Sequence, residues 1–253
     1  MDKIKRNERI GALVKILCDR PNYIYTLNYF SDLFGSSKST ISEDIVIIKD
    51  IFEKFELGDI CTVTGAAGGV KYVPKAYADQ SLNFIKEFCA QLSDPGRILP
   101  GGFVYMTDLL YMPHIAYKIG EILAAQFVDV CPDFIITVET KGIPVAMATA
   151  RALNCPVVIA RRYSKVTEGS VVTINYVSAS SKSIQTMSLP KRAIKQGQRG
   201  LIIDDFMKGG GTARGLIDLM NEFETGIAGV GVVIATGEPQ EKMIKDYKPL
   251  MIL

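Results

Sequence analysis

The sequence predicts a two-domain α/β chain, in which a small helical domain ending in a β-hairpin precedes a larger domain built on a mostly parallel sheet. Three observations lead to this prediction. The chain has 253 residues, 48% of them hydrophobic, which is more than one typical domain needs. Residues 1–75 show apolar side chains at helical spacing and then two short β runs. From Phe103 onward, continuous apolar runs alternate with helical stretches, a pattern typical of parallel sheets covered by helices.

The small domain begins with three predicted helices, over residues 6–19, 26–34 and from Thr40 through Phe52. Gly35 provides a stop for the second helix, and Thr40 has capping-box spacing with Glu43 at the start of the third. Apolar residues at helical spacing are expected to form the core. They are Ile10, Leu13, Val14 and Leu17 in the first helix, Leu27, Phe30 and Leu33 in the second, and Ile41, Ile45, Ile48 and Phe52 in the third.

A glycine-tipped hairpin follows, with strands over residues 60–64 and 70–73 and a tip over residues 65–69. Three helices and such a hairpin resemble a winged helix-turn-helix, in which the third helix enters the major groove of DNA, and a symmetric dimer on two half-sites is the simplest arrangement. The net charge of this segment gives no support for DNA binding, since residues 1–75 carry 11 basic and 10 acidic side chains, a net charge of +1. The alternative is a helical interaction module.

Donors at the start of the third helix, in the N-terminal basic cluster and on the wing are expected to contact phosphates. They are Lys5, Arg6, Ser37, Lys38, Ser39, Thr40 and Lys71. Glu43 and Asp44 would reach base edges only where these present cytosine amines.

Residues 76–100 are predicted to form a linker with a helix over residues 81–92. The larger domain covers residues 101–253. Its expected strands are residues 134–138, 157–160, 201–203 and 229–235, and its expected helices are residues 114–127, 144–153 and 212–223. The chain ends at Leu253 inside a further predicted strand.

The strongest chemical signal is residues 201–212, an apolar strand that runs into two acids and then into a glycine loop opening a helix. The strand carries Asp204 and Asp205 to the carboxyl edge of the sheet, where open α/β folds hold ligands. Three successive glycines let backbone N–H groups converge on a phosphate at the positive end of the helix. The carboxylates repel phosphate, so they accept hydrogen bonds from ribose hydroxyls or lie near a hydrated magnesium ion. The alternative is a plain glycine-rich turn.

This stretch resembles the phosphoribosyl pyrophosphate motif of the type I phosphoribosyltransferases. Residues 138–144 resemble the pyrophosphate loop of that family, and residues 161–165 fall where the family has its flexible loop. A plain βα connection and a solvated basic loop are the alternatives for these two segments. The resemblance implies that phosphoribosyl pyrophosphate is bound by Asp204, Asp205, Phe206, Lys208, Gly209, Gly210, Gly211, Thr212, Thr140, Lys141, Gly142, Arg161 and Arg162.

Over nearly its whole length the chain resembles the purine operon repressors of Gram-positive bacteria. The most specific segments are the wing over residues 65–72 and residues 141–144, 165–170 and 204–208. The resemblance implies an N-terminal winged helix-turn-helix (residues 1–75), a linker helix (residues 76–100) and a type I phosphoribosyltransferase-like parallel-sheet effector domain (residues 101–253). Similar proteins continue beyond the position of Leu253, which predicts a truncated chain.

The same resemblance implies a cytoplasmic, homodimeric repressor of purine biosynthesis genes that binds double-stranded operator DNA and phosphoribosyl pyrophosphate. It implies no catalytic residue and no required cofactor, with magnesium arriving together with the ligand. Guanosine tetraphosphate is expected to compete in the same crevice, with Phe103 or Phe206 stacking on its base and Lys208 on its phosphates. Packing is the alternative role for both phenylalanines.

The second functional hypothesis is an active purine phosphoribosyltransferase fused to a DNA-binding domain. Transfer needs little acid or base help once the developing charges are stabilised. However, the expected base-binding hood over residues 97–102 is short and apolar beyond Arg97, which indicates weak base recognition. A scaffold that binds neither ligand nor DNA leaves Asp204 and Asp205 unexplained.

Composition excludes other classes of protein. His114 is the single histidine and is expected to be structural, so sites with several histidines are impossible. The five cysteines form no CxxC pair, which predicts buried thiols and no metal site. No segment approaches the roughly 20 uninterrupted apolar residues of a membrane-spanning helix, so no membrane partner is expected.

Overall fold

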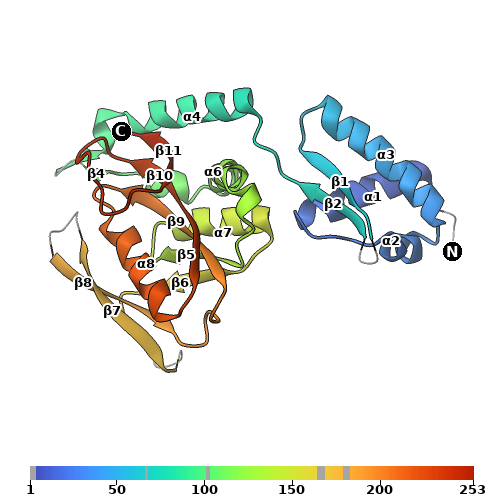
Figure 1. Ribbon diagram of the computed structural model, residues 1–253. Helices are drawn as coiled ribbons and strands as arrows, with labels where there is room; N and C mark the ends of the chain where they lie inside the picture. The colour runs from blue at the N-terminus through green and yellow to red at the C-terminus, as the bar shows by residue number, and fades with distance from the viewer. Residues whose placement is uncertain (1–3, 66–67, 101–102, 164–168, 179–182) are drawn as a thin grey trace. The chain divides into compact units, whose positions relative to one another are not determined.

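The computed structural model describes the chain except for residues 1–3, 66–67, 101–102, 164–168 and 179–182. It contains two compact units, with the change between them at Tyr77 and Ala78. Figure 1 shows the smaller, helix-rich unit in blue and cyan and the larger, sheet-based unit in green to red. Among the described residues, no helix is both long enough and apolar enough to cross a bilayer.

The smaller unit contains three helices and a hairpin in the predicted order. They are α1 (Arg6–Asp19), α2 (Leu27–Phe34), α3 (Lys38–Lys54), β1 (Asp59–Val63) and β2 (Gly69–Val73), with β1 and β2 antiparallel. Tyr25 adds a single bridge to β2, because its N–H and C=O exchange hydrogen bonds of 2.9 and 2.8 Å with Val70. Gly69 permits this approach, since a Cβ there would lie 2.1 Å from the Tyr25 carbonyl oxygen.

The predicted apolar face of α3 is confirmed, because Ile41, Ile45, Ile48 and Phe52 are all buried. The expected burial of Leu33 was wrong. Phe34 takes that place, one turn after Phe30, and leaves Leu33 45% exposed. The predicted start of α3 at Thr40 was also wrong, because the Ser37 hydroxyl accepts the Thr40 N–H at 3.2 Å and caps the helix three residues earlier.

A buried ion pair joins α1 to α3. The Asp44 side chain is fully buried, and its two oxygens accept from Arg6 Nε at 2.9 Å and Arg9 Nε at 2.8 Å. Arg9, itself 7% exposed, also donates to the Ile4 carbonyl oxygen at 3.0 Å. The expectation that Asp44 reaches base edges is therefore wrong, because both its carboxylate oxygens are occupied inside the domain.

A five-stranded parallel sheet forms the centre of the larger unit. Its order is β11-β10-β9-β5-β6. The strands are β5 (Phe134–Val138), β6 (Val157–Ala160), β9 (Arg199–Met207), β10 (Gly226–Ala235) and β11 (Lys248–Ile252). The predicted parallel sheet is confirmed, and β9 extends beyond the expected residues 201–203 at both ends.

The helices of this unit are α4 (Ala78–Leu92), α5 (Thr107–Leu110), α6 (Pro113–Gln126), α7 (Ile143–Leu153) and α8 (Gly211–Glu222), with short 3₁₀ turns over Pro95–Arg97 and Val128–Val130. From the central pair, β5 leads through α7 to β6 on one side, and β9 leads through α8 to β10 on the other. Right-handed crossovers in opposite directions place α7 and α8 on opposite faces of the sheet, as Figure 1 shows. The crossovers diverge between β5 and β9, which is where open α/β sheets form a crevice.

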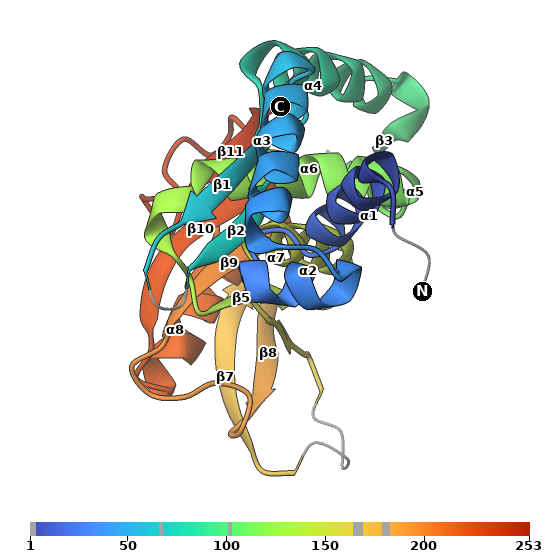
Figure 2. The same ribbon diagram turned by 90° about the vertical axis from the view of Figure 1, so that its right-hand side faces the viewer.

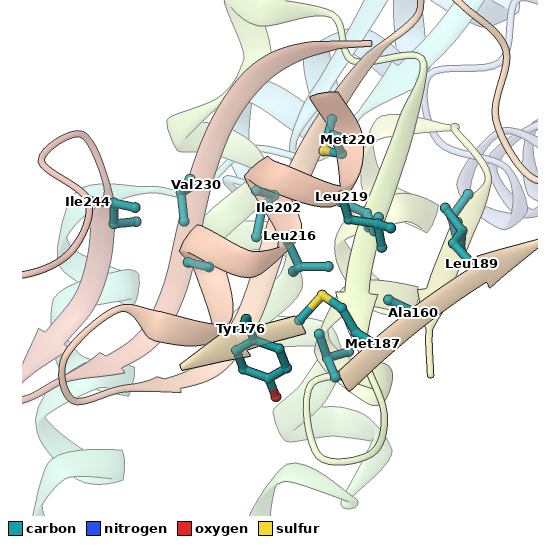
Figure 3. Packing of buried hydrophobic residues seen from close by; sticks show 14 of the residues in the cluster. Ala160, Tyr176, Met187, Leu189, Ile202, Leu216, Leu219, Met220, Val230 and Ile244 are labelled. Atoms are coloured by element: carbon teal, nitrogen blue, oxygen red, sulfur yellow. The ribbon is translucent and has the colours of Figure 1, made fainter. Parts of the chain in front are cut away.

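Two antiparallel pairs complete the larger unit. The short pair is β3 (Ile98–Leu99) with β4 (Phe103–Val104), and the long pair is β7 (Val171–Ser178) with β8 (Ser183–Pro190). The β7–β8 hairpin extends away from the sheet (Figure 2). Its Tyr176 and Met187 lie against α8 beside Leu216 (Figure 3). Gly215 allows this contact, since a Cβ there would lie 2.9 Å from each of the two side chains.

Asp44→Ala is predicted to lower the free energy of unfolding of the smaller unit by about 3–5 kcal/mol, because Arg9 is left buried without a counter-charge. Native-state hydrogen exchange of α1 and α3 amides in the full chain measures this loss. Asp19→Ala is the matched control, since it removes an exposed carboxylate paired with Lys15 and costs at most about 0.5 kcal/mol. Equal losses in the two variants would contradict the prediction.

Candidate functional site

The end of β9 and the start of α8 form the base of a pocket at the carboxyl edge of the sheet. Asp204 and Asp205 lie near the carboxyl end of β9. Gly210 is the N-cap of α8 and adopts the left-handed conformation, with φ 79°. A side chain at Gly210 would be strained by this φ and would lie 3.4 Å from the Met243 backbone nitrogen. The residues at the start of α8 line the pocket. Their backbone N–H groups and the positive end of the helix dipole are therefore available to an anion bound there.

The pocket has a volume of about 610 Å³ and is lined by residues from five stretches of the larger unit. Most of the residues predicted for the ligand site lie around it. They are Asp204, Asp205, Phe206, Lys208, Gly209, Gly210, Gly211, Thr212, Thr140, Lys141 and Arg162. Gly142 and Arg161 are not among the lining residues, and the side chain of Phe103 lies outside the described part of the chain, as do residues 66–67 of the wing and residues 164–168.

The two acids differ in their surroundings. Asp204 is 7% exposed and its Oδ1 accepts the Asp205 N–H at 3.0 Å. Burial, and then the adjacent charge of Asp205, raise the pKa of Asp204 well above its ordinary value. Burial also raises the pKa of Asp205, while Lys141 acts in the opposite direction. The pocket therefore holds two carboxyl groups that are costly to ionise without additional donors or cations.

The β5–α7 loop forms another side of the pocket, with Glu139, Thr140 and Lys141 among the lining residues. Its Glu139 accepts the Arg162 N–H at 2.8 Å and lies 3.5 Å from Arg161 Nη1, so it anchors the chain that leaves β6. The Tyr111 hydroxyl donates to the Thr140 carbonyl oxygen at 3.3 Å. Arg161 is thus engaged with Glu139, whereas Arg162 and Lys141 supply cations to the pocket wall.

The wall formed by β3, β4 and the segment after them is apolar. Leu99, Pro100, Val104 and Met106 are its lining residues. Arg97, the one polar residue expected in this hood, is turned into a bidentate pair with Asp108, with N–O distances of 2.8 and 2.9 Å. None of these four lining residues has a side chain that can hydrogen-bond to a base edge.

Among the polar lining residues, sequence reasoning missed two, Glu139 and Tyr176. Tyr176 is 6% exposed, donates from its hydroxyl to Gln185 Oε1 at 2.8 Å, and faces Thr212 from the β7–β8 hairpin. Burial raises the pKa of Tyr176. The alternation of apolar and polar residues along β7 does not distinguish Tyr176 from a core residue. Tyr176 reaches the pocket only because the hairpin packs on α8.

The residues predicted to contact DNA lie in three places: at the start of α3, at the start of α1 (Lys5 and Arg6), and on β2 of the wing (Lys71). Ser37 Oγ is hydrogen-bonded to the hydroxyls of Ser39 and Thr40 at 2.8 and 2.9 Å, and Lys38 is exposed. Lys5 is exposed, Arg6 is tied to Asp44, and Lys71 Nζ donates to Asn22 Oδ1 at 2.9 Å.

Comparisons with known proteins add family information for both units. Residues 5–74 match the model of the N-terminal region of bacterial purine repressors, and residues 107–252 match the phosphoribosyl transferase domain. The chain is 47% identical to the purine biosynthesis transcriptional repressor PurR of Bacillus subtilis (strain 168), over 99% of this chain and 88% of that protein. It is 41% identical to the purine biosynthesis transcriptional activator PurR of Lactococcus lactis subsp. lactis (strain IL1403), over 98% and 92% of the two chains.

Among solved structures, adenine phosphoribosyltransferase from Thermoanaerobacter pseudethanolicus superposes with a TM-score of 0.59 at 19% identity, covering 67% of this chain and 99% of that chain. This likeness shows the fold of the larger unit alone.

Asp204→Asn is predicted to raise the melting temperature at neutral pH in the absence of ligand. A carboxyl whose pKa is raised by folding loses stability as the pH rises from its ordinary value through the raised one, and an asparagine copies the neutral form. The gain should shrink as the pH falls toward 4, as followed by thermal melts across a pH series. Asp218→Asn, at an exposed position on α8, is the control. A lower melting temperature for Asp204→Asn at neutral pH would contradict the raised pKa.

Proposed function

Because the chain belongs to the bacterial purine repressor family, we propose that it is a DNA-binding repressor of purine biosynthesis genes that senses phosphoribosyl pyrophosphate. The resemblance noted from the sequence is thereby confirmed at the level of the family. The observation that carries the proposal is that one pocket joins the Asp204–Asp205 pair to the glycine loop before α8. This combination suits a ligand with a phosphate and vicinal hydroxyls.

Each part of the ligand has a suitable partner in this pocket. The phosphate of the ribose ring is assigned to the N–H groups of residues 209–212 at the start of α8. The ribose hydroxyls are assigned to Asp204 and Asp205. The pyrophosphate is assigned to the Thr140–Gly142 loop and to the cations of Lys141 and Arg162.

Magnesium fits this site as a companion of the ligand. Mg²⁺ is commonly held by one or two carboxylates together with phosphate oxygens and water, and the Asp204–Asp205 pair supplies those carboxylates. Among the described residues, no group of three or more His, Cys, Asp or Glu side chains forms a metal site of its own. A bound cation would favour the ionised form of the buried pair.

Operator DNA is assigned to the smaller unit. The exposed Lys38 and the hydroxyls of Ser37, Ser39 and Thr40 stand at the start of α3, which suits phosphate contacts. One winged unit offers few contacts, so we propose a homodimer on two half-sites. If phosphoribosyl pyrophosphate lowers the affinity for DNA, then DNA lowers the affinity for phosphoribosyl pyrophosphate by the same factor.

Guanosine tetraphosphate is proposed as the competing nucleotide. Phe206 and Lys208 line the pocket and offer a ring face and a cation to the base and phosphates. The apolar wall formed by Leu99, Pro100, Val104 and Met106 suits a base that is held by contact area more than by hydrogen bonds.

An active phosphoribosyltransferase is the second candidate, favoured by the fold of the larger unit and its acid pair. The same apolar wall argues against it. An enzyme must fix the attacking nitrogen of a base within reach of the sugar, and the described hood residues offer no side-chain hydrogen bonds for that purpose.

Asp204→Ala combined with Asp205→Ala is predicted to leave operator affinity unchanged and to abolish release of the operator by phosphoribosyl pyrophosphate. Gel-shift titrations on promoters of purine genes, with and without the ligand and Mg²⁺, measure both quantities. Asp218→Ala on the outer face of α8 should behave as the wild type. Undiminished release in the double variant would remove the site assignment, whereas wild-type protein that ignores purine promoters would remove the proposed function.

Incubation with labelled phosphoribosyl pyrophosphate and each purine base is predicted to yield no nucleotide. Chromatographic recovery of the label as unreacted ligand and hydrolysis products checks this expectation. Turnover at about 1 s⁻¹ or faster, typical of enzymes, would show that the second candidate function is correct.

A further inference from the structure

Thr137 carries a buried hydroxyl that has no hydrogen-bond partner. It lies in β5, its side chain is fully buried, and its Oγ1 is one of two such atoms among the described residues, the other being Ser81 Oγ on α4. Buried hydroxyls are nearly always paired, because an unpaired one forfeits the hydrogen bonds it makes in water. Valine has the same shape and would avoid that loss, so stability alone does not explain a threonine at this position.

The surroundings of Thr137 belong to the ligand site. An ideal Cβ built on Gly142 would lie 2.5 Å from Thr137 Oγ1, 3.5 Å from Asp204 Oδ1 and 3.6 Å from the Asp205 backbone nitrogen. The pyrophosphate loop, the hydroxyl and the acid pair therefore converge on one point. β5 and β9 pair as far as Ile136 and Ile202, so Thr137 and Asp204 follow the paired residues by one and two positions, at the same edge of the sheet.

Two other buried threonines of the larger unit show the ordinary arrangement. Thr149 donates to the Val145 carbonyl oxygen at 2.9 Å, and Thr225 donates to the Met220 carbonyl oxygen at 2.9 Å. None of the three threonines lines the pocket itself. The unpaired hydroxyl of Thr137 is the one that lies at the Gly142 loop beside Asp204.

We propose that Thr137 is a positioning residue of the ligand site, whose hydroxyl donates to the Asp204 carboxylate when ligand binding shifts the Gly142 loop. The proposal rests on the proposed function, because it needs a ligand whose pyrophosphate recruits the N–H groups of that loop. Ribose hydroxyls need the Asp204 side chain as an acceptor in one fixed orientation, and a second donor to that side chain would fix its orientation. The Asp205 N–H is the donor that Asp204 Oδ1 already has, and the Thr137 hydroxyl, which has no partner of its own, lies at the same Gly142 position.

Thr137→Val and Thr137→Ser test the proposal in the full chain, with Thr149→Val as a matched control. Thr137→Val should melt at or above the wild-type temperature without ligand, while Thr149→Val should melt lower because it loses the hydrogen bond from the buried hydroxyl to the Val145 carbonyl oxygen. For phosphoribosyl pyrophosphate with Mg²⁺, calorimetric titration should show a Kd about tenfold or more weaker in Thr137→Val. Thr137→Ser should restore the affinity, and Thr149→Val should keep it.

Three results would overturn the inference. A drop in the melting temperature of Thr137→Val equal to that of Thr149→Val would mean that the hydroxyl already has a partner. An unchanged Kd in Thr137→Val would mean that the hydroxyl does not act on the bound state. Wild-type protein that fails to bind phosphoribosyl pyrophosphate would sink the proposed function together with this inference, whereas wild-type binding with an unaffected Thr137→Val would sink the inference alone.

Discussion

Two carboxyl groups side by side at the end of a buried strand are the constraint on which the larger unit depends. Parallel strands can carry polar residues to their carboxyl edge because the helices that cover the sheet leave a crevice where the crossovers diverge. Asp204 lies deep in that crevice, and burial makes its ionisation costly. The neighbouring elements fit around it closely. Gly142 has no room for a Cβ beside Thr137, and Gly210 turns the chain into α8 with a positive φ.

Elements with strong periodicity could be predicted from the sequence, and those decided by competing local chemistry could not. The apolar stripe of α3 and the continuous run of β5 each have one packing solution, because the amphipathic face or the fully buried strand admits no other. The start of α3 had several suitable caps in the polar run 36–40, and Ser37 was chosen over Thr40. Asp44 looked like a surface acid until the packing of α1 placed two arginines over it.

The candidate site divides in the same way. Its sequence-local half, the acids and glycines of residues 204–212, could be predicted because strand, turn and helix follow one another along the chain. The other half depends on tertiary packing. Tyr176 enters the pocket because the β7–β8 hairpin lies on α8, as Figure 3 shows. Glu139 anchors the chain after β6, and Arg97 is withdrawn from the hood by Asp108. No spacing rule relates these residues to the glycine loop, so a single sequence carries no signal for them.

A sensor and an enzyme place different demands on such a pocket. An enzyme gains rate only from contacts that are stronger in the transition state than with the bound substrate, so its base must be held as precisely as its sugar. A sensor needs only a ligand that binds two states of the protein unequally. Buried carboxyls with raised pKa values and an unpaired threonine hydroxyl are features whose energy changes most when cations, hydroxyls and phosphates arrive. The contact energy of the apolar wall, by contrast, depends little on which base is bound. The polar groups of this pocket thus interact mainly with the phosphoribosyl part of the ligand. This arrangement suits detection of the ligand better than its chemical conversion.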